Sequence, residues 1–402
     1  MTTGSTLQDP TTLRQAMVCA LREEDAITSD AVAAAFAAVP RHLFAPAADP
    51  ATAYSLHKTV PVKKDSSGAD LSVMSAAHLQ GVMLEQAQIE PGMNVLEIGS
   101  GGVNAAMLQE LVGRDGGTVT TVDIDSDVVD QASRCLCAAG YERVRVVLAD
   151  AERGVDGGPF DRIIVTFGAW DIAPVWLSSL ARNGRLVVPL RLRGLTRSIA
   201  FVRDGDGLVS TSYRLARFVP AQGDGAFDER KVMVREGVVV QTDAPNIDLD
   251  GMALDRALGA PRLEAWSGEA YDLPDELELY LATNLSSPVR LHASDAVIGQ
   301  GVVEPSARLG VPALVGRESI AYRTRRENEA TGGFESGVIA HGPDAQGLAE
   351  QYLHLLEHWA REHRRRGAAQ FRYLPTAAAP AALLQEPSTV AKHHGAVAVS
   401  WH

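Results

Sequence analysis

The sequence predicts an α/β protein: a mostly parallel sheet of about seven strands, preceded by helices and followed by an extra α+β domain. Two observations carry this prediction. Between residues 94 and 218, short apolar runs alternate with stretches of helical spacing, which is typical of a parallel sheet with crossover helices. The chain has 402 residues, which is enough for two or three domains.

The composition excludes several classes of protein. Asp and Glu number 50 against 37 Lys and Arg, a formal net charge of -13, which argues against nucleic acid as a partner. The chain lacks a run of about 18 apolar residues, and its start, MTTGSTLQDP, lacks the parts of a signal peptide. The 3 cysteines lack CxxC spacing. We therefore expect a cytoplasmic protein with reduced thiols, no membrane contact and no metal site.

The first region, residues 1–90, is predicted to be mainly helical. Residues 11–39 show two stretches of helical spacing, and Pro40 ends the second. Residues 46–69 are polar and irregular, which predicts a mobile loop. Helical spacing returns over residues 73–88.

The central region, residues 91–220, holds the predicted strands. The first five are nearly continuous apolar runs, as in buried parallel strands. The last two flank a turn at residues 204–207 and are predicted to pair antiparallel. The runs are residues 95–98, 119–122, 144–148, 163–165, 186–190, 199–202 and 212–218.

A second domain is predicted over residues 221–375, followed by a disordered, Ala-, Pro- and His-rich tail over 376–402. The expected elements are strands at 234–240, near Val297 and at 313–315, and helices at 252–258, 277–283 and 346–366. Arginines gather at residues 323–326 and 361–366. The latter complement a helix C-terminus, and both groups could also dock an acidic peptide.

The most informative motif follows the first central strand, where Val95–Ile98 leads into Gly99, Ser100, Gly101 and Gly102 and then a helix. Glycines at such a turn let a ligand approach the backbone, and the helix N-terminus offers free N–H groups. Asn104 stands where a pyrophosphate-binding GxGxxG needs glycine, which disfavours nicotinamide and flavin cofactors. Glu97 suits an adenosyl ligand without phosphates. The alternative is a tight turn and nothing more.

Two acids end the next strands. Asp123 follows the second strand, where a carboxylate can accept hydrogen bonds from two ribose hydroxyls. Asp150 follows the third strand and could accept from an adenine amino group. For Asp123 the alternative is an N-cap of the helix from Ser126, and the two roles are compatible.

These elements together resemble the class I S-adenosylmethionine-dependent methyltransferases. Three flanking segments, VPRHLFAP at 39–46, PFDRIIVT at 159–166 and NGRLVVPL at 183–190, make residues 11–220 similar to the protein-L-isoaspartate O-methyltransferase family. The resemblance implies S-adenosylmethionine as cofactor. It places the cofactor against Glu97, Gly99, Ser100, Gly101, Asn104, Asp123, Ile124, Asp150 and Ala151.

The chain departs from this family at two motifs. The family's glycine loop usually reads G-T-G-S-G-Y, whereas residues 99–104 read G-S-G-G-V-N. The family's T-I-S-Q-P segment corresponds to Val73–Ala77, in which only Ser75 is retained. The resemblance implies that Ser75 orients the acceptor carboxylate. The alternative for Ser75 is an N-cap of the helix from Ala76.

The length beyond residue 220 resembles the long O-methyltransferases of lanthipeptide and related ribosomal peptide pathways, the FxLD system group. This resemblance implies a modified precursor peptide as substrate and partner, recognised by the second domain. A methylated aspartate in it would collapse to an aspartimide and hydrolyse to isoaspartate. The alternatives are repair of isoaspartyl proteins and, from another class, a module that binds S-adenosylmethionine or peptide without catalysis.

Overall fold

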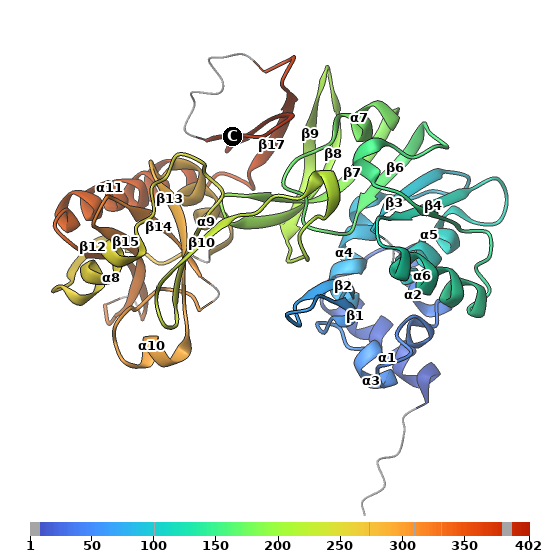
Figure 1. Ribbon diagram of the computed structural model, residues 1–402, viewed down its shortest axis with the longest axis horizontal. Helices are drawn as coiled ribbons and strands as arrows, with labels where there is room; N and C mark the ends of the chain where they lie inside the picture. Colours follow the sequence, from blue (N-terminus) through green and yellow to red (C-terminus); the bar gives the residue numbers. More distant parts are fainter. Residues whose placement is uncertain (1–8, 100, 273, 309, 331, 380–387) are drawn as a thin grey trace, which may run out of the picture. The chain divides into compact units, whose positions relative to one another are not determined.

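The computed structural model describes residues 9–99, 101–272, 274–308, 310–330, 332–379 and 388–402 (Figure 1). The chain divides into two compact units. The first comprises Met1–Leu190 with Thr196–Phe227, and the second comprises Arg191–Leu195 with Asp228–His402. Within the described ranges, no helix combines the length and apolar character needed to cross a membrane.

The first unit begins with the two predicted helices, α1 (Pro10–Glu23) and α2 (Asp30–Ala38). Each starts at an acceptor side chain: Asp9 accepts from the Thr12 N–H, and Ser29 accepts from the Val32 N–H. A short 3₁₀ helix, η1 (Arg41–Phe44), follows. The prediction of two opening helices is confirmed.

The prediction of a mobile loop over residues 46–69 is wrong. A short helix α3 (Pro50–Ala53) leads to strand β1 (Val60–Lys64), which pairs antiparallel with β2 (Asp70–Met74). Asp65 Oδ1 accepts from the N–H groups of Ser67 and Ala69 and so closes the turn. The polar residues that looked like loop composition are turn residues with their own hydrogen bonds.

The main sheet of the first unit has the predicted strands. They lie in the order β9-β8-β7-β6-β3-β4-β5. The pairs β3–β4, β3–β6, β4–β5 and β6–β7 are parallel, and β8–β9 is the predicted antiparallel pair. The bounds are β3 (Asn94–Ile98), β4 (Thr118–Asp123), β5 (Arg145–Leu148), β6 (Phe160–Val165), β7 (Leu180–Leu192), β8 (Leu195–Asp204) and β9 (Gly207–Leu215).

Helices precede β3 or connect the parallel strands, and they complete the core. They are α4 (Ala77–Ala87), α5 (Val103–Val112), α6 (Ser126–Ala138) and α7 (Pro174–Ser179), with 3₁₀ turns η2 (Ala151–Arg153) and η3 (Gly223–Gly225). Asp125 caps α6 by accepting from the Asp127 and Val128 N–H groups. Because consecutive parallel strands end at the same edge, the loops after β3, β4 and β6 come together there.

The second unit has its own antiparallel sheet, with strand order β10-β11-β13-β14-β15-β16-β12 and its own apolar core. The strands are β10 (Arg230–Arg235), β11 (Val238–Thr242), β12 (Leu263–Ala270), β13 (Pro288–Ala293), β14 (Val311–Val315), β15 (Ile320–Asn328) and β16 (Gly333–His341). The helices are α8 (Gly251–Gly259), α9 (Pro274–Asn284), α10 (Asp295–Gly299) and α11 (Ala345–His358).

Three sequence predictions for this unit are wrong. The single strand expected at 234–240 is a hairpin of β10 and β11, turning at Gly237 with φ of 78°. The segment near Val297 is helix α10, which Ser294 caps. The helix expected to reach residue 366 is α-helical only to His358 and continues as a π-helical turn, η4 (Trp359–His363).

The prediction of a disordered tail after residue 376 is also wrong for part of the segment. Strand β18 (Thr389–Ala391) pairs with β19 (Gly395–Ser400), and β19 pairs with β17 (Gln370–Pro375). Val397 and Val399 are buried. Residues 380–387 lie outside the described residues. The Ala-, Pro- and His-rich composition gave no strand pattern for β18 and β19. Their apolar residues are buried only when these strands pair with each other and β19 pairs with β17.

Candidate active site

A cleft lies where β3, β4 and β6 end in the first unit. It is partly open to solvent, and we call it the strand-end cleft. The predicted residues in its wall are Gly99, Gly101, Asp123, Ile124, Asp150 and Ala151. Residues from β2, Leu71, Ser72 and Val73, also line it. Six residues predicted from strand ends therefore share one cavity.

The glycine loop leaves no room for side chains where it turns. Gly99 has φ of 98°, and a Cβ there would lie 2.5 Å from Thr166 Oγ1. Gly102 has φ of 79°, and its Cβ would approach Phe44 to 3.1 Å. Gly101 differs, because a Cβ there would meet nothing within 4 Å. The backbone at Gly101 thus borders open space, which is the cradle that a ligand approaching the main chain requires.

The two strand-end acids differ in their local bonds. Asp123 accepts from the Asp125 N–H at 3.0 Å, and the N-cap of α6 is Asp125 rather than Asp123. Asp150 Oδ1 accepts from the Glu152 N–H at 3.0 Å, and Oδ2 accepts from the Asp224 N–H at 2.9 Å. Asp150 is therefore the N-cap of η2, and it also holds the turn η3 over this end of the cleft.

The side chains that line the strand-end cleft are acidic, which favours a cationic ligand. Asp123, Asp125, Asp150 and Glu152 line it, and its described lining contains no Lys or Arg. Burial and the nearby Asp150, Asp171 and Asp224 carboxylates raise the pKa of Glu152 to about 7. Such a wall disfavours phosphates and suits a cationic ligand with hydroxyl and amino donors. S-adenosylmethionine, with a sulfonium, an ammonium and a ribose, fits this description.

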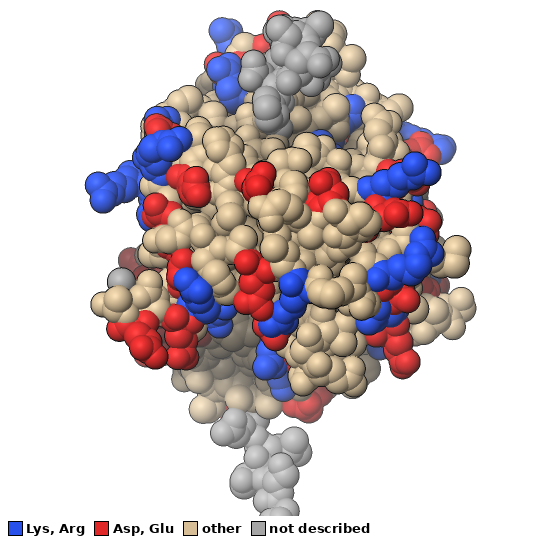
Figure 2. Space-filling view, turned by 90° about the vertical axis from the view of Figure 1, so that its left-hand side faces the viewer, with Lys and Arg blue, Asp and Glu red and all other residues tan. Residues whose placement is uncertain are grey.

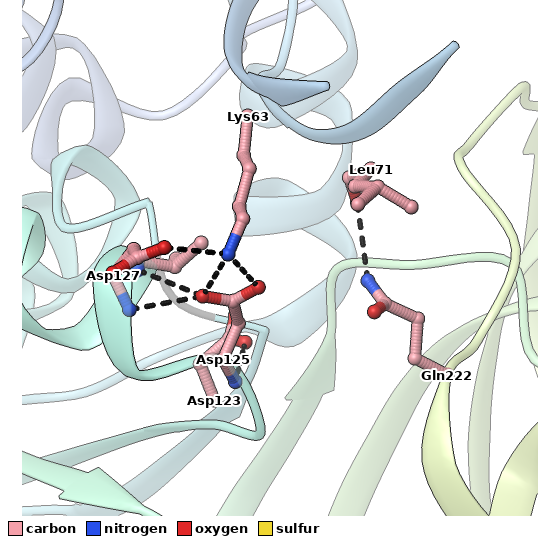
Figure 3. A network of polar contacts seen from close by, with 7 residues as sticks. Lys63, Leu71, Asp123, Asp125, Asp127 and Gln222 are labelled. Atoms are coloured by element: carbon pink, nitrogen blue, oxygen red, sulfur yellow. Dashed lines mark hydrogen bonds and ion pairs between the residues drawn. The ribbon is translucent and has the colours of Figure 1, made fainter. Parts of the chain in front are cut away.

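The hairpin of β1 and β2 is fastened along the cleft at two points (Figure 3). Lys63 Nζ lies 2.6 Å from Asp125 Oδ2 and 2.7 Å from Asp127 Oδ2, and these carboxylates raise the pKa of Lys63. Gln222 Nε2 donates to the Leu71 carbonyl at 3.4 Å. The sequence prediction missed this contribution because Lys63 and Gln222 lie far from the glycine loop in the chain.

A second pocket adjoins the first, and we call it the Ser75 pocket. Both share Val73, Gly99, Gly101 and Thr166 in their walls. Ser75, Glu97 and Asn104 line the second pocket. Ser75 does not cap a helix, because α4 starts after Ala76 without a side-chain cap. The predicted site residues are thus placed at one pocket or the other, except Ser100, which lies outside the described residues; their binding roles stay predictions.

Glu97 is fully buried at the end of β3. Its Oε1 accepts from Asn104 Nδ2 at 2.8 Å, and its Oε2 accepts from Thr121 Oγ1 at 2.6 Å. Burial raises the pKa of Glu97 to about 7, the Asp123 charge adds to this, and the two hydrogen bonds oppose it. The Glu97 carboxyl therefore titrates in the physiological range.

The arginines expected to dock a peptide are mostly engaged within the second unit. Arg323 is fully buried and lies 4.1 Å from the Tyr271 ring centre. Arg326 pairs with Glu335 at 2.7 Å, and Arg364 pairs with both Glu269 and Asp272. Figure 2 shows a face of the molecule on which acidic and basic side chains intermingle. Arg323, Arg326 and Arg364 are therefore engaged within the unit.

Comparison with known proteins shows the family to which the chain belongs. The family model of protein-L-isoaspartate(D-aspartate) O-methyltransferase matches residues 12–225, more than half of the chain. The chain belongs to this family. It is accordingly an S-adenosylmethionine-dependent methyltransferase, and the strand-end cleft at the glycine loop is where we place the cofactor.

Similar proteins carry the same name. A protein-L-isoaspartate O-methyltransferase of Pyrococcus horikoshii is 33% identical over 214 residues, which are 52% of this chain and 92% of the relative. One of Thermotoga maritima is 32% identical over 214 residues, which are 52% of this chain and 67% of the relative. A solved structure of that name, 19% identical, aligns with a TM-score of 0.51 over 96% of this chain and 99% of the other, which supports the fold.

Proposed function

We propose that the protein methylates the side-chain carboxylate of an aspartyl or isoaspartyl residue in a peptide. The observation that carries this proposal is the junction of the two pockets at Gly99, Gly101 and Thr166. A methyl donor in the strand-end cleft and a carboxylate in the Ser75 pocket would meet at that junction. Ser75 is the hydroxyl that we assign to orienting the acceptor.

The chemistry asks for position rather than for acid–base catalysis. S-adenosylmethionine, when bound, supplies an electrophilic methyl group on a positively charged sulfur. A carboxylate oxygen forms the new bond to the methyl carbon, and the pair of electrons of the broken S–C bond stays on sulfur. No proton moves, because a carboxyl with an ordinary pKa of about 3.9 is ionised at neutral pH. Alignment of the two reactants can supply about 7 to 11 kcal/mol at best.

The residues divide this task between them. Asp123 would accept from the ribose hydroxyls, and Asp150 and Ala151 would lie at the adenine. The Ala151 carbonyl is already fixed by the Trp176 indole N–H at 3.1 Å. The hairpin held by Lys63 forms one wall of the cleft and limits the access of water, which would otherwise screen the attraction between carboxylate and sulfonium.

The finer proposal is a dedicated substrate: an aspartate of a ribosomally made, modified peptide of the lanthipeptide kind, handled in the cytoplasm. The methyl ester would then close to an aspartimide by attack of the next backbone nitrogen. Its support is the acceptor segment Val73–Ala77, which keeps only Ser75 of the family motif. The second unit, with its own sheet and core, would recognise the peptide.

Repair of isoaspartyl proteins is the second candidate, and the names of the relatives favour it. Length alone does not separate the two candidates. The Thermotoga maritima relative is covered over only 67% of its own length, so that protein also extends beyond the matched segment.

Two acceptor peptides distinguish the dedicated function from repair. Methyl transfer is measured by mass spectrometry on a generic isoaspartyl hexapeptide and on a precursor peptide encoded beside the gene. The dedicated function predicts a much higher kcat/KM for the precursor, with the methyl group on an aspartate. A hexapeptide that is methylated as well as the precursor would establish repair instead. Calorimetric binding of S-adenosylmethionine without methylation of either peptide would overturn both.

A further inference from the structure

The Arg41 side chain is buried completely, yet it reaches the Ser75 pocket through two of its neighbours. Its Nε donates to the Ala53 carbonyl at 3.1 Å, and its Nη2 donates to the Ser75 carbonyl at 2.9 Å. Its Nη1 donates to Oε1 of Gln80. Burial lowers the pKa of Arg41 to about 10, so the guanidinium stays charged at neutral pH.

This contact fixes which way the Gln80 amide points. A guanidinium has donors and no acceptor, so the amide oxygen of Gln80 must face Arg41. The amide NH₂ therefore points away from Arg41. Gln80 is 6% exposed and lines the Ser75 pocket. Within the described residues, the bond to Arg41 is the only hydrogen bond of this side chain.

The Ser75 pocket needs donors if it is to hold a carboxylate. Its described lining contains one charged residue, Glu97, and no Lys or Arg. The Asn104 NH₂ group donates one of its two hydrogens to Glu97 at 2.8 Å. The Thr166 hydroxyl, also in this wall, donates to the Gly99 carbonyl at 2.8 Å. The Ser75 hydroxyl and the Gln80 NH₂ group are two further donors in this wall. Both belong to residues that the same buried guanidinium holds: Ser75 through its backbone carbonyl, Gln80 through its side chain.

We infer that Gln80 binds the acceptor carboxylate through its Nε2 hydrogens, and that Arg41 is the positioning residue that aims Gln80 and holds the Ser75 backbone. This inference rests on the proposed carboxyl methylation. The Arg41 charge also polarises the Gln80 amide and strengthens its hydrogens as donors. A carboxylate can thus be bound next to Glu97 without a cation in the pocket wall.

The kinetic consequence has a definite direction. The acceptor carboxylate loses negative charge as the methyl group is transferred, so a hydrogen bond to it is strongest before the reaction. Removal of this bond should raise KM for the acceptor and leave kcat unchanged or slightly higher. For a hydrogen bond to a charged group, the expected rise in KM is about 10- to 100-fold.

The test uses the full-length protein and two substitutions at Gln80. Q80E keeps an oxygen for Arg41 but removes the donor and adds a like charge, and Q80L removes both groups. Each is compared with the wild type for KM and kcat on an isoaspartyl or aspartyl peptide that the wild type methylates. Calorimetric affinity for S-adenosylmethionine is the control. We expect a raised KM in both variants, larger for Q80E, with unchanged cofactor affinity.

Arg41 is tested through R41K, alone and combined with Q80L. If Arg41 acts through Gln80, R41K should raise KM in the wild type and raise it less in the Q80L background. A Q80L variant with wild-type KM would overturn the assignment of Gln80 while leaving carboxyl methylation in place. Loss of cofactor affinity in step with the rise in KM would also overturn it, because a merely structural role predicts that result. A wild type that methylates neither peptide would instead refute the proposed function itself.

Discussion

The buried carboxyl of Glu97 predicts a pH-dependent stability that one substitution should remove. Glu97 is 0% exposed, and its pKa is raised from 4.5 to about 7, mainly by burial. The folded protein thus holds this proton more tightly than the unfolded chain does. The stability that the proton contributes is complete below pH 4.5 and is lost as the pH rises towards 7. The loss amounts to about 3 kcal/mol, since each tenfold change in an equilibrium is worth about 1.4 kcal/mol.

The variant for this test is Glu97→Gln, which does not ionise. Its amide oxygen can accept one of the present hydrogen bonds, and its NH₂ group can donate to the Thr121 hydroxyl, which can reverse its role. Other acids titrate equally in both proteins, so the difference between the two unfolding free energies isolates Glu97. This difference should rise by about 3 kcal/mol in favour of E97Q between pH 4.5 and 7.5.

Urea unfolding followed by circular dichroism, at a series of pH values, measures this difference. A difference that stays constant within about 1 kcal/mol over the range would refute the reasoning, because Glu97 would then ionise as it does in the unfolded chain. Asn104→Ala provides a directional control. It removes a hydrogen bond that favours the ionised form, so the pH dependence of N104A should extend to higher pH.

Three further predictions concern the cofactor cleft and the acceptor. Asp123→Ala should weaken S-adenosylmethionine binding about 10- to 100-fold in calorimetry, and an unchanged affinity would show that the ribose lies elsewhere. Ser75→Ala should lower methyl transfer about tenfold with little loss of cofactor affinity, whereas wild-type kinetics would remove Ser75 from the site. Lys63→Met should release the cofactor severalfold faster in stopped-flow experiments, because the ion pairs to Asp125 and Asp127 are lost. Lys58→Met, on the exposed approach to the same hairpin, should not; equal rates in both variants would refute a role for Lys63.

The central sheet could be predicted because its inner strands β3, β4 and β6 are mostly buried. A strand such as β3 is nearly continuous in apolar residues, and Val95, Leu96 and Ile98 are buried. Short strands with one exposed face give no such pattern. In β1, Pro61 and Lys64 are exposed, and the hairpin turn at Asp65 is polar, so the segment has loop composition. Its contacts are the pairing with β2, the hydrogen bonds of the Asp65 turn and the ion pairs of Lys63 with residues that follow β4.

The site was predictable to the extent that chain neighbours define it. The glycine loop and the acids Asp123 and Asp150 follow strands that the periodicity reveals, and parallel strands bring their ends together. Lys63 and Gln222 reach the same cleft from segments that are distant in the chain. The residue types alone do not indicate that these two side chains lie there. The PRHLF segment, residues 40–44, contains Arg41, which holds Gln80. Gln80 lies 39 residues away from Arg41 in the chain and is brought to it only by the fold.

The position of η1 predicts that this segment, which lies outside both pockets, affects methyl transfer. Phe44, at one end of η1, packs where a Cβ of Gly102 would lie 3.1 Å from its ring, and so restricts the glycine loop. Arg41, at the other end, holds the Ser75 carbonyl and the Gln80 amide. One turn of helix therefore contacts the loop that would approach the donor and the segment that would hold the acceptor. In-line transfer loses rate steeply when its reactants shift by about 1 Å, so a shared rigid contact keeps both in register.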